Sequence, residues 1–104
     1  MPTEQYHEPD SELSKETRTF ARMITGLIEE ADAINWYEQR ISVEKNEDAK
    51  AIMINAQKEE FKHFSMDLEF LLRQKDDWRK IINAVISKPG DIVKNGEKAE
   101  KKVD

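Results

Sequence analysis

Three side chains that can bind metal ions interrupt the apolar stripes of this chain. Glu30 stands between Leu27 and Ile34, and Glu60 and His63 form a Glu-x-x-His motif further along. Residues three apart on a helix project from the same face, so the motif presents a carboxylate and an imidazole together. Burying a carboxylate without a partner costs on the order of several kcal/mol. We therefore expect these three groups to share a ligand.

Carboxylate oxygens with one imidazole per metal ion favour iron or manganese over structural zinc. Carboxylate-bridged di-iron bundles combine a Glu from each of two helices with a Glu-x-x-His motif from each of two others. This chain contains half of that set, and a two-fold dimer would complete it with Glu30, Glu60 and His63 of both subunits. For the motif alone, a surface ion pair or a core histidine bonded to Glu60 are the alternatives. The addition of Glu30 and the apolar neighbours favours the metal site.

Two long amphipathic helices are expected to position these residues. Apolar residues step by three and four from Phe20 to Ile41, which predicts a first helix of more than seven turns. Asp10, Ser11 and Ser14 can each cap its beginning. The pattern lapses at 42–45, and Asn46 is typical of the N-cap of a second helix. The short connection makes the two helices antiparallel neighbours.

The position of the loop predicts the depth of the three side chains along this hairpin. With the turn centred near residues 44–45, Glu30 lies about 14 residues before it, and the Glu-x-x-His motif about 16 to 19 residues after it. A helix rises about 1.5 Å per residue, so the two levels differ by only ~3–6 Å. Glu30, Glu60 and His63 can therefore meet at one height.

The rest of the chain divides into three parts. Residues 1–10 contain two prolines and no periodic pattern, which indicates an extended arm. Residues 11–88 hold the helical hairpin and a short third helix, whose apolar positions run from Trp78 to Ile86 before Pro89-Gly90 ends it. Residues 89–104 are rich in lysine and glutamate, which predicts a flexible charged tail.

Composition limits the classes of function. The chain has 104 residues, no cysteine and a net charge of −5, which argues against disulfide scaffolds, thiolate metal sites and nucleic-acid binding. No segment resembles a signal peptide or a membrane span, so we expect a cytoplasmic protein. With 38% of its residues charged, the chain has little apolar surface for a core, and it is predicted to complete that core by dimerising.

The sequence resembles a known family, the encapsulated ferritins, which work inside encapsulin shells. The resemblance extends over roughly residues 6–93 and rests on four segments: YHEP (6–9), IEEADAINWYEQR (28–40), AQKEEFKHFSMDLEFLLR (56–73) and the short helix with Trp78. It implies an all-α fold in which an antiparallel two-helix hairpin, with a short C-terminal helix, dimerises into a ferritin-like four-helix bundle.

The resemblance also implies roles for individual residues. Glu30, Glu60 and His63 match the ferroxidase ligands of a di-iron centre, and Tyr37 matches a tyrosine beside it. Glu29 and Asp32 match an outer acidic pair that binds incoming metal, calcium or another divalent ion, and helps to join dimers. The family has Glu more often at the second of these positions. The alternatives are a solvated acidic surface for Glu29 and Asp32 and ordinary core packing for Tyr37.

As a member of this family, the chain would form an annular decamer of five dimers and oxidise Fe(II) with O₂. A ring has no closed cavity, so the encapsulin shell would store the iron. The expected location is inside an encapsulin nanocompartment in the cytoplasm. The family's tail usually ends in a short apolar segment that docks in the shell, whereas this chain ends KNGEKAEKKVD, and no targeting peptide is evident.

Two other functions are compatible with the same residues. The chain could be a non-enzymatic helical oligomer or adaptor, whose buried acids set the register of assembly. It could also be a metal buffer that binds iron without oxidising it. In any metal site, His63 must be neutral to act as a ligand, so metal binding is expected to weaken below about pH 6.

Overall fold

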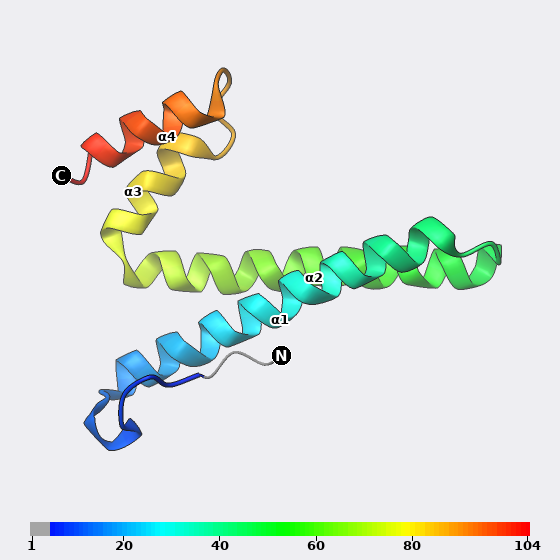
Figure 1. Ribbon diagram of the computed structural model, residues 1–104, viewed down its shortest axis with the longest axis horizontal. Coiled ribbons are helices and arrows are strands. Elements are labelled where there is room, and N and C mark those ends of the chain that lie inside the picture. The colour runs from blue at the N-terminus through cyan, green and yellow to red at the C-terminus, as the bar shows by residue number, and fades with distance from the viewer. Residues whose placement is uncertain (1–4) are drawn as a thin grey trace. The chain divides into compact units, whose positions relative to one another are not determined.

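The computed structural model describes residues 5–104, and the regular elements in that range are all helices, with no strand. After a 3₁₀ turn, η1 (Asp10–Glu12), come α1 (Lys15–Val43), α2 (Glu47–Gln74), α3 (Asp76–Val85) and α4 (Ile92–Lys101) (Figure 1). The predicted all-α class is confirmed. Within the described residues, no helix combines the length and the apolar character needed to cross a lipid bilayer.

Capping side chains define where the two long helices begin. Ser14 caps α1, because its Oγ accepts a hydrogen bond from the Thr17 backbone N–H at 3.0 Å. Of the three residues that could have capped this helix, Asp10 instead lies in η1. Asn46 caps α2 as predicted, with its Oδ1 accepting from the Ala49 N–H at 2.9 Å. The first four residues of the predicted arm lie outside the described part of the chain.

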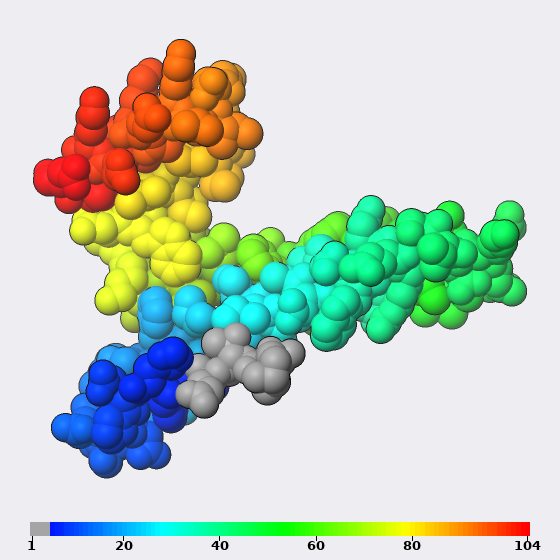
Figure 2. All heavy atoms as spheres, in the orientation of Figure 1, coloured from blue at the N-terminus to red at the C-terminus, as the bar shows by residue number. Residues whose placement is uncertain are grey.

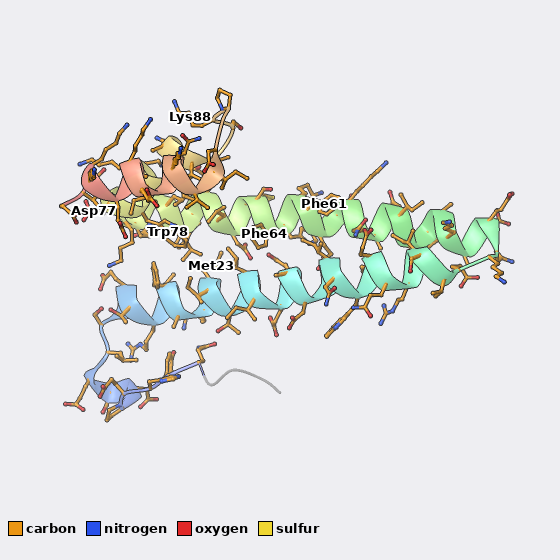
Figure 3. All side chains as sticks on the ribbon, turned by 45° about the horizontal axis from the view of Figure 1, so that its top comes forward. Met23, Phe61, Phe64, Asp77, Trp78 and Lys88 are labelled. Carbon is orange, nitrogen blue, oxygen red and sulfur yellow. The ribbon has the colours of Figure 1, made fainter. Side chains whose placement is uncertain are left out.

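α1 and the part of α2 up to Phe70 form an antiparallel hairpin joined by residues 44–46 (Figures 1 and 3). Figure 3 places Met23 of α1 and Phe64 of α2 between the two helices, and Figure 2 shows the atoms of α1 lying over α2 near the connecting loop. This arrangement follows from the apolar stripes of the two helices, which bury against each other because the loop is too short for any other pairing.

Gln57 links the two helices at a buried position. Its side chain is only 9% exposed, and its Nε2 donates to the Ile34 carbonyl oxygen at 3.2 Å and to Glu38 Oε1 at 2.9 Å. Because both acceptors belong to α1, these bonds fix how far α1 and α2 are shifted along each other. Both hydrogens of the buried amide are used in hydrogen bonds, so holding α1 and α2 in this register leaves no Gln57 donor unsatisfied.

The chain divides into two compact units, residues up to Phe70 and residues from Leu71 onward. In the described residues, the buried hydrophobic side chains are Leu71, Leu72 and Ala99, all in the second unit. In that unit α3 packs against α4. The first unit instead leaves large hydrophobic side chains exposed, among them Trp36, Ile52, Phe61 and Met66. The hairpin therefore carries apolar surface that a single chain does not cover.

The prediction of a flexible tail over 89–104 was wrong, because Ile92–Lys101 is a helix. Asp91 caps it by accepting from the Lys94 N–H at 2.9 Å, and Ala99 is fully buried. Ser87 (φ 64°) and Gly90 (φ 98°) make the reversal between α3 and α4. The segment is highly charged, so its composition did not indicate a helix. One N-cap and one small buried residue are enough to stabilise a helix here, because a neighbouring helix is available for packing.

Replacing Asp91 with Ala should loosen α4. Loss of an N-cap costs about 1 kcal/mol, which corresponds to roughly fivefold faster amide hydrogen exchange in residues 92–101 if α4 opens on its own. Hydrogen–deuterium exchange with mass spectrometry measures this. Glu97→Ala, at an exposed position of the same helix, is the matched control and should not accelerate exchange. Equal exchange in Asp91→Ala and the parent would contradict the role of the cap.

Candidate metal centre

Glu30 lies midway between two contacts that join the helices of the hairpin. Asp67 of α2 approaches α1 four residues before Glu30, and Gln57 bonds to the α1 backbone four residues after it. On α2, the position midway between 57 and 67 falls beside His63. The register of the helices thus brings Glu30 to the level of the Glu-x-x-His motif, as the spacing of the sequence predicts.

Glu60 and His63 project together from one turn of α2. His63 Nδ1 lies 3.0 Å from Glu60 Oε1, with side chains that are 45% and 21% exposed respectively. In a single chain this imidazole is partly exposed, so it is accessible either to a metal ion or to a surface ion pair with Glu60. The carboxylate orients the ring, as the partner of a metal-binding histidine commonly does.

The carboxyl group of Glu30 is in an unfavourable environment for its charge. Its Oε2 atom is buried, and no partner in residues 5–104 satisfies it. Burial raises the pKa of Glu30 to about 7, with further contributions from a hydrogen bond to the Asp67 carboxyl and from the charges of Asp67 and Glu60, while His63 opposes the shift. A hydrogen bond between two carboxyl groups requires one of them to carry a proton. A cation at this point would replace that proton.

Asp67 is the one member of this cluster to which the sequence pattern assigned no role. It follows His63 by four residues and therefore lies on the same face of α2. Its carboxylate lies against Gly26 of α1, where a Cβ atom would stand 3.2 Å from Asp67 Oδ2. The spacing from His63 could have indicated Asp67, but nothing in the sequence shows that Gly26 would let it come so close to Glu30.

These residues fit a hard divalent cation such as Fe(II). The donor set is carboxylate oxygen with one imidazole, Glu30 Oε2 is buried without a partner, and Gly26 leaves room for a further carboxylate. In the described part of a single chain, no group of three or more His, Asp or Glu side chains is arranged so that it could hold a metal ion.

The remaining predicted site residues lie along α1 on either side of this cluster. Glu29 and Asp32 are exposed, and neither belongs to the charges that shift the pKa of Glu30. Tyr37 is half-buried, with the Arg40 guanidinium 5.4 Å from its ring centroid. That distance is typical of a cation–π contact, which helps to hold the ring in place.

Residues 5–88 match the family model EncFtn-like. The chain belongs to the EncFtn-like family. The family match includes α1, α2, α3 and the cluster around Glu30, whereas α4 follows it in the sequence. The resemblance stated from the sequence is thereby confirmed.

Individual relatives agree with this membership. The EncFtn-like chain is 37% identical over 83 residues to a ferritin-like protein of Thermotoga maritima, a match that spans 80% of this chain and 73% of that protein. It is 33% identical over 86 residues to an encapsulated ferritin-like protein of Rhodospirillum rubrum, spanning 83% of this chain and 61% of that one. A crystal structure of a Nitrosomonas europaea protein is similar at a TM-score of 0.81 and 36% identity, covering 84% of this chain and 96% of the other.

The raised pKa of Glu30 predicts that the folding stability of the metal-free EncFtn-like chain depends on pH. The pKa of Glu30 is about 7 in the folded chain, against an ordinary value of 4.5. Between pH 4.5 and about pH 7 the carboxyl group of Glu30 is therefore protonated in the folded chain and ionised in the unfolded chain. The free energy of unfolding falls as pH rises through that range. Glu30→Gln should therefore raise Tm at pH 8, by a few degrees, and change it little at pH 4. Circular dichroism melts of metal-free protein measure this, with the exposed neighbour Glu29→Gln as control. A lower Tm for Glu30→Gln at pH 8 would contradict the assignment.

Proposed function

We propose that this protein is a ferroxidase that oxidises Fe(II) to Fe(III) with O₂ at a di-iron centre between two subunits. Each subunit contributes Glu30, Glu60 and His63. The observation that carries the proposal is the buried, unpartnered carboxylate oxygen of Glu30 at the level of a Glu60–His63 pair on the neighbouring helix. A cation satisfies that oxygen, whereas the protein groups of a single chain leave it without a partner.

The exposed surface of the hairpin supports the two-subunit arrangement. One chain supplies two long helices, which is half of a four-helix bundle, and large hydrophobic residues such as Phe61 and Met66 are exposed on them. Removing large apolar side chains from water favours association. Packing two hairpins about a two-fold axis would cover such residues and bring both sets of ligands to one place. The homodimers would assemble further into an annular decamer.

The chemistry of the site is a two-electron transfer from substrate iron. Two Fe(II) ions each give one electron to O₂, which takes up two protons from water and leaves as hydrogen peroxide, with two Fe(III) ions as the other product. The carboxylates of Glu30 and Glu60 stabilise the added positive charge, because oxygen anions bind Fe(III) more strongly than Fe(II). His63 completes the set of ligands through a ring nitrogen.

The raised pKa of Glu30 gives this residue a second role. Near neutral pH its carboxyl group holds a proton for part of the time, and binding of Fe(II) must displace that proton. Burial, which raises the pKa, also strengthens the attraction of the ionised carboxylate for a cation, because the local dielectric constant is low. Without iron, the carboxyl group of Glu30 is only partly ionised. With iron bound, it is fully ionised and is a strong ligand.

The other family positions are assigned to delivery and assembly. Glu29 and Asp32, exposed on α1 one turn from each other, would bind incoming Fe(II), calcium or another divalent ion and help to join dimers into the ring. Tyr37, held beside Arg40, would stand next to the centre as a hydrogen-bond or electron donor. The net charge of −5 favours the approach of Fe(II) over that of anions.

The Rhodospirillum rubrum relative is described as encapsulated, and we extend this to the present protein. The oxidised iron would pass to storage in an encapsulin nanocompartment in the cytoplasm, with the encapsulin shell protein as partner. This arrangement suits a protein whose ring has no closed cavity of its own. Neither nucleic acid nor membrane enters this proposal.

Glu60→Gln and His63→Ala should each reduce the initial rate of O₂ consumption with Fe(II) by at least tenfold, because each removes a ligand from both iron positions. An oxygen electrode under limiting Fe(II) measures the rate. Glu59→Gln is a closely matched control, because this exposed neighbour forms a surface ion pair with Lys62 at 2.8 Å, and it should oxidise iron like the parent. Parental rates in both ligand variants would rule out the proposed centre, and iron binding without O₂ consumption would favour the metal buffer.

Iron should bind in pairs to pairs of subunits. With the outer acidic pair removed by Glu29→Gln and Asp32→Asn, native mass spectrometry without O₂ should show two Fe(II) ions per dimer, or ten in a decamer of five dimers. Adding Glu60→Gln to that variant should abolish this added mass. A non-enzymatic adaptor predicts no change of mass or assembly when Fe(II) is added. One iron per isolated monomer would contradict a centre shared between subunits.

A further inference from the structure

We propose that Asp67 is a fourth metal ligand of each subunit, in addition to Glu30, Glu60 and His63. The inference rests on the proposed function, because it assigns a new residue to the same centre. It begins from position: Asp67 lies one turn beyond His63 on α2 and two turns beyond Glu60. Residues spaced by three, four and seven positions share one face of a helix. The three side chains of α2 therefore form a continuous row on the face that meets Glu30.

Gly26 makes the approach of Asp67 possible. An Ala Cβ at position 26 would stand 3.2 Å from Asp67 Oδ2, which is closer than most carbon–oxygen contacts allow. A glycine inside a helix costs about 1 kcal/mol relative to alanine, and here it leaves space for a carboxylate against the α1 backbone. That space lies one turn before Glu30, so the carboxylate it admits is directed to the same place.

Two carboxylates placed close together repel each other unless a positive charge lies between them. Asp67 Oδ2 lies against Gly26, one turn before Glu30 on α1. The Oε2 atom of Glu30 is buried and has no partner in the described chain, so water does not stabilise its charge. A divalent cation supplies the missing positive charge, and it can bind oxygens of both groups at once.

The charges of the whole centre support the same assignment. In a two-fold dimer, Glu30 and Glu60 contribute four negative charges, which balance two Fe(II) ions but leave two Fe(III) ions with an excess of two positive charges. The Asp67 pair brings the total to six, which matches the ferric state. Asp67 would therefore favour the ferric over the ferrous state of the centre, which adds to the driving force for oxidation.

Substitution of Asp67 distinguishes a ligand from a neighbour that merely repels Glu30. Asn keeps the size of the side chain and can donate a hydrogen bond to Glu30, which favours folding. If Asp67 is a ligand, Asp67→Asn should weaken Mn²⁺ binding at pH 7 by at least tenfold. If Asp67 is only a neighbour of the centre, its removal costs no more than the through-space attraction of one charge, and Mn²⁺ binding should weaken by less than about threefold. That result overturns the proposal.

The measurement is isothermal titration of the full-length, metal-free protein with Mn²⁺, which does not depend on oxidation. Glu60→Gln is the reference for the proposed function and Glu59→Gln the unaffected control. Loss of binding in Glu60→Gln with parental binding in Asp67→Asn refutes only the role of Asp67. Parental binding in both refutes the di-metal centre as well.

A second variant covers the case in which Asp67→Asn does not fold, as judged by circular dichroism and native mass spectrometry. Gly26→Ala keeps Asp67 but pushes its carboxylate away from α1, while alanine favours the helix. It should weaken Mn²⁺ binding severalfold with an equal or higher Tm. In that case, Mn²⁺ affinity equal to that of the parent would overturn the assignment of Asp67.

Discussion

The proposed site in the hairpin depends on one unfavourable interaction, the placement of the Glu30 carboxyl group against α2 with its Oε2 atom buried. An isolated helical hairpin gains stability from apolar contacts and loses it wherever a charge leaves water. Here the charge is buried beside a second carboxyl group, that of Asp67, with one oxygen left without a partner. The rest of the hairpin holds this arrangement in place, through the Gln57 bonds on one side and the open space at Gly26 on the other.

The distribution of burial indicates why the proposed site would be completed by a second chain. In the described residues the fully buried hydrophobic side chains belong to the unit from Leu71 onward, whereas the hairpin carries the polar cluster and exposed large hydrophobic residues. A hairpin that neither covers its apolar surface nor balances its buried charge is an incomplete structure. Under the proposed function, dimerisation would cover the apolar surface and iron binding would balance the buried charge. Both would occur at the interface between two hairpins.

The sequence pattern predicted much of the fold, and the level at which Glu30 meets the Glu-x-x-His motif, for clear physical reasons. The helical period, the Asn46 cap and the short loop determine an antiparallel pair, and counting residues from the loop places Glu30 at the level of His63. These features are local, or follow from helix geometry. Membership of the EncFtn-like family was likewise recognisable from the residues around Glu30 and the Glu-x-x-His motif. The oxidation of iron and the sharing of ligands between subunits remain predictions.

What the pattern could not supply depends on packing between distant residues. Asp67 resembles any other acid on a charged helix until Gly26 is found opposite it. Similarly, α4 has the composition of a disordered tail, and its helix depends on one cap and on Ala99, which is buried in a unit where α3 is available for packing. In both cases the decisive residue is small, a glycine or an alanine, and hydrophobic periodicity gives little weight to small residues.

Two residues of α1 that lower the stability of the hairpin, Gly26 and Glu30, lie one turn apart. Gly26 weakens α1, and Glu30 loses hydration by burial. Neither cost is needed to form a helical hairpin, because alanine and leucine at these positions would suit both helices better. Under the proposed function, a bound cation would offset these costs, since it would balance the carboxylates that Gly26 admits and Glu30 supplies. Metal binding would then add to the stability of the assembled protein, so the features that make the metal-free chain less stable would be the ones that favour the metal-bound state.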